Sequence, residues 1–203
     1  MKIAVYSGSF NPLHIGHLAI MRHLTQEAGF DWVYLIVSPK NPIKDSISED
    51  SAQERYEAAI EAVVRHPELR VWVDDIELHM PSPQYTIRTL DALKEREPEN
   101  EFTLVIGGDN LAGIRRWRDY KRILTDYGVV VFPRTGFDSP ALKADLEAEW
   151  STENDRTEED SMTDCSAESG YRIRLLEAGM VDISSTEIRE GIAEGRDMSE
   201  FLM

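Results

Sequence analysis

Short apolar runs recur along the chain, separated by longer segments of mixed polarity. The runs are rich in β-branched residues and comprise IAVY from Ile3, VYLIV from Val33, VWV from Val71, FTLVI from Phe102 and VVVF from Val129. Nearly continuous apolar runs of this length predict strands that are buried on both faces of a sheet. A later run, YRIRLL from Tyr171, is a candidate for a further strand.

The segments between these runs have helical spacing of apolar residues. Examples are HLAIMRHLTQEAG from His17 and SAQERYEAAIEAVVRH from Ser51, in which Ser51 and Glu54 match a capping box. DISSTEIREGIAEG from Asp182 predicts a turn that enters a last helix. Alternation of strand and helix predicts an α/β fold, a doubly wound, Rossmann-like parallel sheet with helices on both faces. In such a fold the ligand crevice lies at the carboxyl ends of the strands.

The chain has 203 residues, a length that predicts one domain over residues 1–203. One region departs from the pattern, from about 146 to 170, where acidic residues, Ser and Thr dominate. We expect this region to be a solvated, flexible insertion.

The charge balance narrows the choice of partners. The formal net charge is −16, so the overall field repels nucleic acid and anionic membranes. A small phosphate compound remains possible if its cleft is locally basic. Cys165 is the only cysteine and excludes an internal disulfide. A reducing, cytoplasmic location is therefore expected. The sequence leaves the oligomeric state open, a homo-oligomer included.

The loop after the first strand carries the strongest candidate chemistry. It reads GSFNPLHIGH from Gly8 and leads from a strand toward a helix, the usual place for phosphate binding. Gly8 permits close backbone approach, and His14 and His17 can offer imidazole donors to one polyphosphate. The alternatives are that the two histidines cap the helix or bind a metal. A metal site lacks further obvious ligands, because the other histidines lie on other segments.

Two separated motifs, GSFNPLHIGH and ISSTEIR from Ile183, resemble the nucleotidyltransferase superfamily and, within it, the bacterial nicotinate-nucleotide adenylyltransferases. SPKNPIK from Ser38, the pair Tyr85 and Thr86, and GGDNLAGIRRW from Gly107 also agree with that family. Phosphopantetheine adenylyltransferases and cytidylyltransferases fit these residues less well. Ile43 departs from the family, in which a His commonly precedes the loop Lys.

The resemblance implies an adenylyl transfer from ATP to nicotinate mononucleotide that releases pyrophosphate and requires Mg²⁺. The rivals are an adenylyltransferase for nicotinamide mononucleotide or another small phosphate compound, and a nucleotide-sensing module without catalysis. The residues expected to act in catalysis are His14, His17, Lys44 and Arg189. Those expected to bind ATP are Gly8, Ser9, Phe10, His14, His17, Ser184, Ser185, Thr186 and Arg189. No protein-held metal site is expected.

The acceptor nucleotide is expected to contact a second group of residues, each of which also has a structural reading. By the resemblance, Trp117 stacks on the pyridine ring, although its spacing from Leu111 and Ile114 also suits core packing. Asp109 suits ribose hydroxyls or hydrated Mg²⁺, or a helix cap. The remaining expected contacts are Lys44, Thr86 at a helix start, and Arg134.

Overall fold

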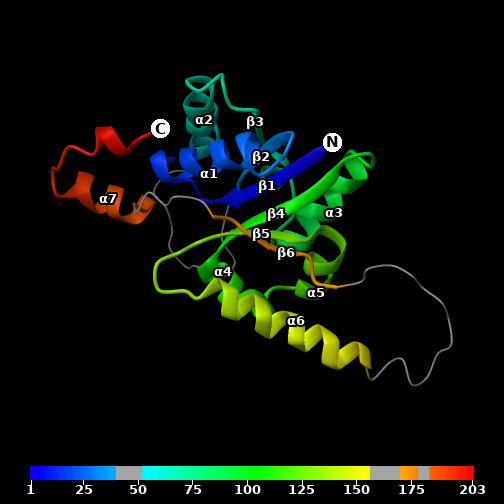
Figure 1. Ribbon diagram of the computed structural model, residues 1–203. Coiled ribbons are helices and arrows are strands. Elements are labelled where there is room, and N and C mark those ends of the chain that lie inside the picture. Colours follow the sequence, from blue (N-terminus) through cyan, green and yellow to red (C-terminus); the bar gives the residue numbers. More distant parts are fainter. Residues whose placement is uncertain (40–51, 156–169, 178–182) are drawn as a thin grey trace.

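Six parallel strands form a single sheet in the computed structural model, which describes residues 1–39, 52–155, 170–177 and 183–203. The sheet has the order β3-β2-β1-β4-β5-β6 (Figure 1). The strands are β1 (Lys2–Gly8), β2 (Trp32–Val37), β3 (Val71–Asp74), β4 (Glu101–Gly107), β5 (Val129–Phe132) and β6 (Ile173–Leu175). Each of the predicted apolar runs is confirmed as a strand, including the run from Tyr171.

The strand order reverses at the middle of the sheet. From β1 the chain builds outward through β2 and β3, then returns to place β4 against the other side of β1. Val5 of β1 is thus flanked by Tyr34 of β2 and Leu104 of β4. Loops that follow β1 and β4 leave in opposite directions from this point, which opens a crevice at their carboxyl ends. The predicted doubly wound fold is confirmed.

Helices cover both faces of the sheet (Figure 1). They include α1 (Ile15–Gln26), α2 (Ala52–Val64), α3 (Thr86–Arg96), α4 (Gly108–Ala112), α5 (Tyr120–Arg122), α6 (Ser139–Asp155) and α7 (Ser185–Ala193). Shorter helical turns are η1 (Ile76–Leu78), η2 (Ile114–Arg116), η3 (Ile123–Tyr127) and η5 (Ser199–Phe201). The predicted helices near His17 and after Asp182 are confirmed, whereas the Ser51 and Glu54 capping box includes a residue outside the described part.

Alternate residues of β1 divide the core into two layers. Ala4 and Tyr6 pack with apolar side chains of α1 and α2, while Ile3 and Val5 pack with those of α3, α4 and η3. Successive side chains of a strand point to opposite faces, so a strand that is covered on both faces must be apolar throughout. This double coverage explains the uninterrupted apolar runs in the sequence.

The expectation of a flexible segment from residue 146 is wrong for its first part. Helix α6 continues to Asp155, and Leu146 is buried against the core at 1% exposure. Trp150 also packs on this core, with its ring centroid 4.9 Å from that of Tyr171. Leu142, Leu146 and Trp150 recur every four residues, which is one helix face. The many acidic residues obscured that face in the sequence, and residues 156–169 lie outside the described part.

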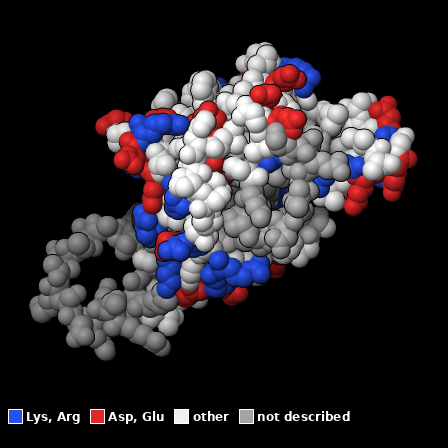
Figure 2. Space-filling model, turned by 180° about the vertical axis from the view of Figure 1, so that it is seen from behind, with Lys and Arg blue, Asp and Glu red and all other residues white. Residues whose placement is uncertain are grey.

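The surface charge is unevenly distributed. Figure 2 shows Lys and Arg side chains gathered together on one face, although the formal net charge is −16. A locally basic surface on an acidic protein is therefore present. Among the described helices, none is long and apolar enough to cross a membrane.

We expect Leu146→Ala to lower the free energy of unfolding by about 2–5 kcal/mol, because it leaves a cavity between α6 and the sheet. The control is Glu147→Ala on the exposed side of the same helix, where a change within about 0.5 kcal/mol is expected. Urea unfolding of both variants gives the comparison. Equal stabilities would show that α6 is not docked.

Candidate active site

Both histidines of the first loop lie at the start of α1. His14 is the N-cap residue, and its Nδ1 accepts a hydrogen bond from the Gly16 N–H at 3.1 Å. The Nδ1 of His17 accepts one from the His14 N–H at 3.2 Å. The two imidazoles thus form a reciprocal capping box, with ring centroids 3.7 Å apart. Helix capping, which the sequence left open as an alternative, is a role that both residues have.

Capping determines which nitrogen of each ring can bind a ligand. A ring nitrogen that accepts a hydrogen bond carries no proton, so each neutral ring has its proton on Nε2. Within the described residues, neither Nε2 of His14 nor that of His17 has a hydrogen-bond partner. Each ring therefore retains one N–H donor for a phosphate oxygen. The two roles are compatible because they use different nitrogens.

Burial keeps these imidazoles neutral. It is the largest cause that lowers the pKa of His14 to about 4, with a further lowering by Arg134 and a smaller opposing effect of Glu187. Burial, the neighbouring His14 and then Arg134 lower the pKa of His17 well below its ordinary value. At neutral pH the two rings can therefore donate hydrogen bonds from closely packed positions without repelling each other as like charges.

Phe10 packs against one ring of the histidine pair. Its buried ring makes edge contacts with Tyr6 and His17, with centroid separations of 5.2 Å and 5.1 Å. A Cβ atom on Gly8 would lie 3.1 Å from the Phe10 ring, so Gly8 allows the strand end to approach it closely. The structure thus gives the Phe10 side chain a packing role beside the predicted phosphate loop. Ser9 follows Gly8 and lines the cavity described below.

The C-terminal motif lies against this same loop. Arg189 donates to the Asn11 carbonyl oxygen at 2.6 Å, and the Ser185 hydroxyl donates to the Pro12 carbonyl oxygen at 3.0 Å. Arg189 also donates a hydrogen bond to the hydroxyl of Thr186, in its own helix, at 3.2 Å. Figure 1 shows α7 beside the start of α1. Two motifs separated by most of the chain are therefore neighbours.

Ser184 begins α7 through a capping box. Its Oγ accepts from the Glu187 N–H at 3.2 Å, and the Glu187 carboxylate accepts from the Ser184 N–H at 2.8 Å. The first N–H groups of a helix point outward and favour anions. The Ser184 side chain is thus used for capping, while α7 directs its amino end toward the region of the first loop.

Asp109 and Arg134 face each other at the ends of β4 and β5, with 3.8 Å between Oδ1 and Nε. A Cβ atom on Gly107 would lie 2.4 Å from the Asp109 carboxylate, and one on Gly108 would lie 2.7 Å from the Ser139 hydroxyl. The paired glycines thus allow this carboxylate and helix α6 to approach the strand end. Neither Asp109 nor Arg134 lines the cavity, but the charge of Arg134 acts on both histidines.

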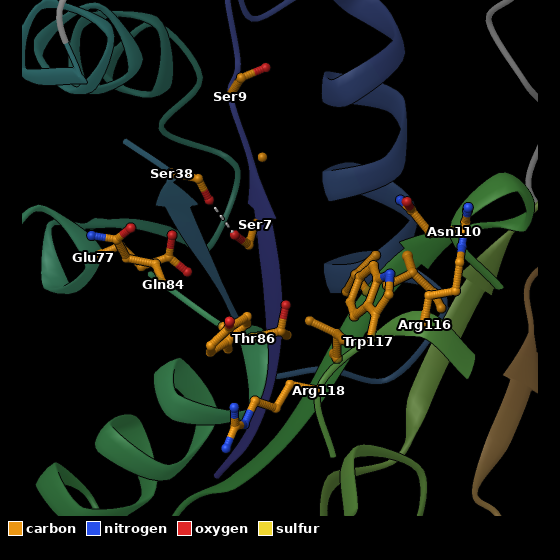
Figure 3. Close-up of a pocket in the computed structure, with 15 residues that line it drawn as sticks. Ser7, Ser9, Ser38, Glu77, Gln84, Thr86, Asn110, Arg116, Trp117 and Arg118 are labelled. Atoms are coloured by element: carbon orange, nitrogen blue, oxygen red, sulfur yellow. Dashed lines mark hydrogen bonds between the residues drawn. The ribbon is translucent and has the colours of Figure 1, made fainter. Parts of the chain in front are cut away.

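A cavity of about 170 Å³ adjoins the first loop at the carboxyl ends of β1 and β4. Thr86 and Trp117, both predicted to bind the acceptor, line it, as do Gly8 and Ser9 of the predicted ATP loop. Trp117 also packs on the core, as its spacing predicted, and its stacking on a ligand stays a prediction. In Figure 3, Trp117 lies across the cavity from Glu77.

The amino end of α3 forms part of the cavity wall. Tyr85 is the N-cap residue and makes no side-chain capping hydrogen bond, and Thr86 is the first helical residue. The opening N–H groups of this helix thus have no side-chain cap. An uncapped helix start favours a carboxylate or phosphate. The prediction of a helix start at Thr86 is confirmed, and its role in binding stays a prediction.

Several residues that line the cavity were assigned no binding role from the sequence. They are Ser7, Ser38, Glu77, Gln84, Tyr85, Asn110, Arg116 and Arg118. Arg116 and Arg118 flank Trp117, so basic residues beside a candidate stacking residue were an available signal. Glu77 follows β3, and no neighbouring residue in the sequence indicated that it lines a cavity. Lys44 lies outside the described residues.

The comparisons with known proteins agree with this geometry. A family model described as "Cytidylyltransferase-like" matches residues 5–191. A relative named "Probable nicotinate-nucleotide adenylyltransferase" from Flavobacterium johnsoniae is 33% identical over 100% of this chain and 92% of its own length. A relative of the same name from Bacteroides fragilis is 35% identical over 99% of this chain and 87% of its own.

A solved structure has the same fold at lower identity. It is described as Plasmodium falciparum nicotinic acid mononucleotide adenylyltransferase complexed with NaAD and superposes with a TM-score of 0.73 at 16% identity. The alignment covers 98% of this chain and 87% of that one. The fold and paired motifs thus define a cytidylyltransferase-like nucleotidyltransferase. Within that class the chain belongs to the nicotinate-nucleotide adenylyltransferase family.

We expect the stability to fall as the pH decreases from about 6.5 toward 4. The pKa of His14 is lowered from 6.5 to about 4 in the folded protein, so the unfolded chain binds more protons within this window. Above the window this contribution to stability is fully present. Urea unfolding of the wild type and His14→Asn at several pH values measures it, since Asn can cap α1 but does not titrate. Identical pH slopes would contradict the assignment.

His17→Ala should lower turnover by at least about a hundredfold, because loss of one preorganised donor to developing charge commonly costs about 2.7–4 kcal/mol. The matched control is His23→Ala on the same helix, where the imidazole faces Glu27 at 3.1 Å instead. Steady-state release of pyrophosphate gives the rates, and thermal unfolding verifies the fold. Near-normal turnover of a folded His17 variant would exclude its catalytic role.

Proposed function

We propose that this chain transfers the adenylyl group of ATP to nicotinate mononucleotide, which forms nicotinate adenine dinucleotide and pyrophosphate. The observation that carries the proposal is that the first loop and the cavity lie side by side at the carboxyl ends of the strands and differ in chemistry. The first loop, which carries His14 and His17, is contacted by Arg189 of α7, and donors of these kinds suit a polyphosphate. The neighbouring cavity combines an aromatic ring with an uncapped helix start.

In the proposed reaction, a phosphate oxygen of the acceptor attacks the α-phosphorus of ATP. The bond from that phosphorus to the oxygen bridging the α- and β-phosphates breaks, and pyrophosphate leaves with the electron pair. The acceptor phosphate is already a nucleophile, so the protein need only align the groups and stabilise charge. No covalent enzyme intermediate is required.

The Nε2–H groups of His14 and His17 donate to the ATP phosphates, with His17 at the oxygens of the α-phosphoryl group. Charge accumulates on these oxygens during transfer, and preorganised donors in a dry site stabilise it. Arg189, on α7, contributes positive charge beside the same loop. Its present contacts with Asn11 and Thr186 hold its guanidinium at the loop. The hydroxyls of Ser185 and Thr186 and the Ser184 cap keep α7 directed toward the β- and γ-phosphates.

Mg²⁺ fits this site as a companion of ATP. Among the described residues, no group of three or more His, Cys, Asp or Glu side chains is placed to hold a metal ion. Asp109 is a single carboxylate with Arg134 close by. Mg²⁺ often remains hydrated and is bound largely through substrate phosphates, with one or two protein carboxylates. When bound, the ion would neutralise phosphate charge, and we assign Asp109, at the end of β4, to contact its water shell.

The acceptor occupies the cavity, with its pyridine ring on Trp117 and its carboxylate at the start of α3. Thr86 and the following residue present backbone N–H groups there, and the neighbouring Arg116 and Arg118 add positive charge. A carboxylate accepts hydrogen bonds only, so it suits a group of donors.

We assign the reaction to the cytoplasm, on the basis of the single cysteine.

The acceptor preference tests this function. We expect kcat/KM for nicotinate mononucleotide to exceed that for nicotinamide mononucleotide by at least about ten- to a hundredfold, since an unpaired buried donor costs about 1–3 kcal/mol. The assay measures pyrophosphate release with both acceptors, at saturating ATP and Mg²⁺, from one enzyme preparation. Equal efficiencies, or a preference for the amide, would overturn the substrate assignment. Absence of any pyrophosphate release would instead favour the nucleotide-sensing alternative.

A further inference from the structure

A buried carboxyl group lies in the cavity wall and has no place in the chemistry described above. Glu77, in η1, is 3% exposed. Its Oε1 accepts a hydrogen bond of 2.8 Å from the hydroxyl of Thr89, which is 1% exposed. Within the described residues no Lys, Arg or His forms an ion pair with it, whereas the equally buried Asp74 is paired with Arg96. A carboxyl group buried among neutral partners costs stability.

The partners of Glu77 come from three different elements. Thr89 belongs to α3, one turn after Thr86. Burial raises the pKa of the Glu77 carboxyl group, and the hydroxyls of Ser38, just after β2, of Thr89, and of Ser7, in β1, act against that rise. The two serine hydroxyls are 2.9 Å apart, as drawn in Figure 3. Glu77 is thus bonded to α3 and lines the same cavity as the serines at the carboxyl ends of β1 and β2.

Helix α3 has no side-chain cap to define where its first turn lies. Its apolar residues Ile87, Leu90 and Leu93 pack on the sheet. Apolar packing restrains the depth of the helix strongly but its rotation and sliding less, because it is not directional. The hydrogen bond from Thr89 to Glu77 is directional and lies one turn from the N–H groups that face the cavity. It therefore restrains the first turn of α3 where a ligand would contact it.

We propose that Glu77 is a positioning residue for the acceptor nucleotide: through Thr89 it sets the amino end of α3 at the place where its N–H groups bind the acceptor carboxylate. The inference rests on the proposed function and deepens it, because it names what determines recognition of a carboxylate at that site. Glu77 acts through an oxygen that accepts the hydrogen bond from Thr89.

The test separates acceptor binding from general stability. Thr89→Val keeps the shape of the side chain but removes the hydroxyl, and it should raise KM for nicotinate mononucleotide at least about tenfold, while KM for ATP and kcat change less than about threefold. The preference over the amide acceptor should fall by a similar factor. The control is Thr25→Val, a buried helical threonine whose hydroxyl bonds to the Met21 carbonyl oxygen at 3.0 Å and which lies outside the cavity. It should lower stability without a selective rise in the acceptor KM.

Variants of Glu77 complete the test. Glu77→Leu should reproduce the rise in acceptor KM. Glu77→Gln retains an oxygen that can accept from Thr89, so its acceptor KM should stay close to that of the wild type. An unchanged acceptor KM in Thr89→Val, a parallel loss in both KM values and kcat, or equal defects in the Leu and Gln variants would overturn the inference while the proposed function stands. A wild-type protein that neither binds nor adenylates nicotinate mononucleotide would overturn both. Calorimetric titration with this nucleotide supplies the binding measurement.

Discussion

Parallel pairing of β1 with both β2 and β4 is the constraint on which the rest of this structure depends. Because all strands run in one direction, every strand ends at the same edge of the sheet. Because the order reverses at β1, the chain segments that follow β1 and β4 separate there and leave a crevice. The histidine loop, the cavity and the Asp109–Arg134 pair all lie at that edge. Double coverage by helices makes the strands apolar, so the polar chemistry is confined to the loops.

The side of this edge that we propose to bind ATP has neutral donors close to a few cations. The formal net charge of −16 opposes a polyphosphate at long range. Capping through Nδ1 leaves Nε2–H on His14 and His17, and burial keeps both rings uncharged. Neutral donors can pack at a ring separation of 3.7 Å, where two imidazolium ions would repel each other. Arg134 and Arg189 then supply positive charge from other segments.

The side proposed to bind the acceptor differs in chemistry, because the proposed function requires it to recognise a flat ring and a small anionic group. Trp117 offers its indole to the cavity while part of it remains in the core, which restrains its orientation. The opening turn of α3 presents N–H groups without a competing side-chain cap. A helix start is useful for recognition only if its position is defined, and Glu77 and Thr89 make the directional contact that can define it. In that proposal, binding and folding depend on the same buried polar group.

The sequence by itself determined the fold class, the strands and the two principal motifs, since these depend on local periodicity and on residues close together in the chain. The apolar runs, the helix start at Thr86 and the loop from Gly8 to His17 could all be predicted for this reason. Helix α6 was missed between residues 146 and 155 because its apolar face of Leu142, Leu146 and Trp150 is narrow and its other residues are acidic. Only the tertiary structure decided that α7 contacts Asn11 and Pro12, which nitrogen of each histidine accepts a hydrogen bond, and that Glu77 accepts one from Thr89 in the cavity wall. Those features depend on the distances between segments far apart in the chain, and such distances are set by packing against the sheet.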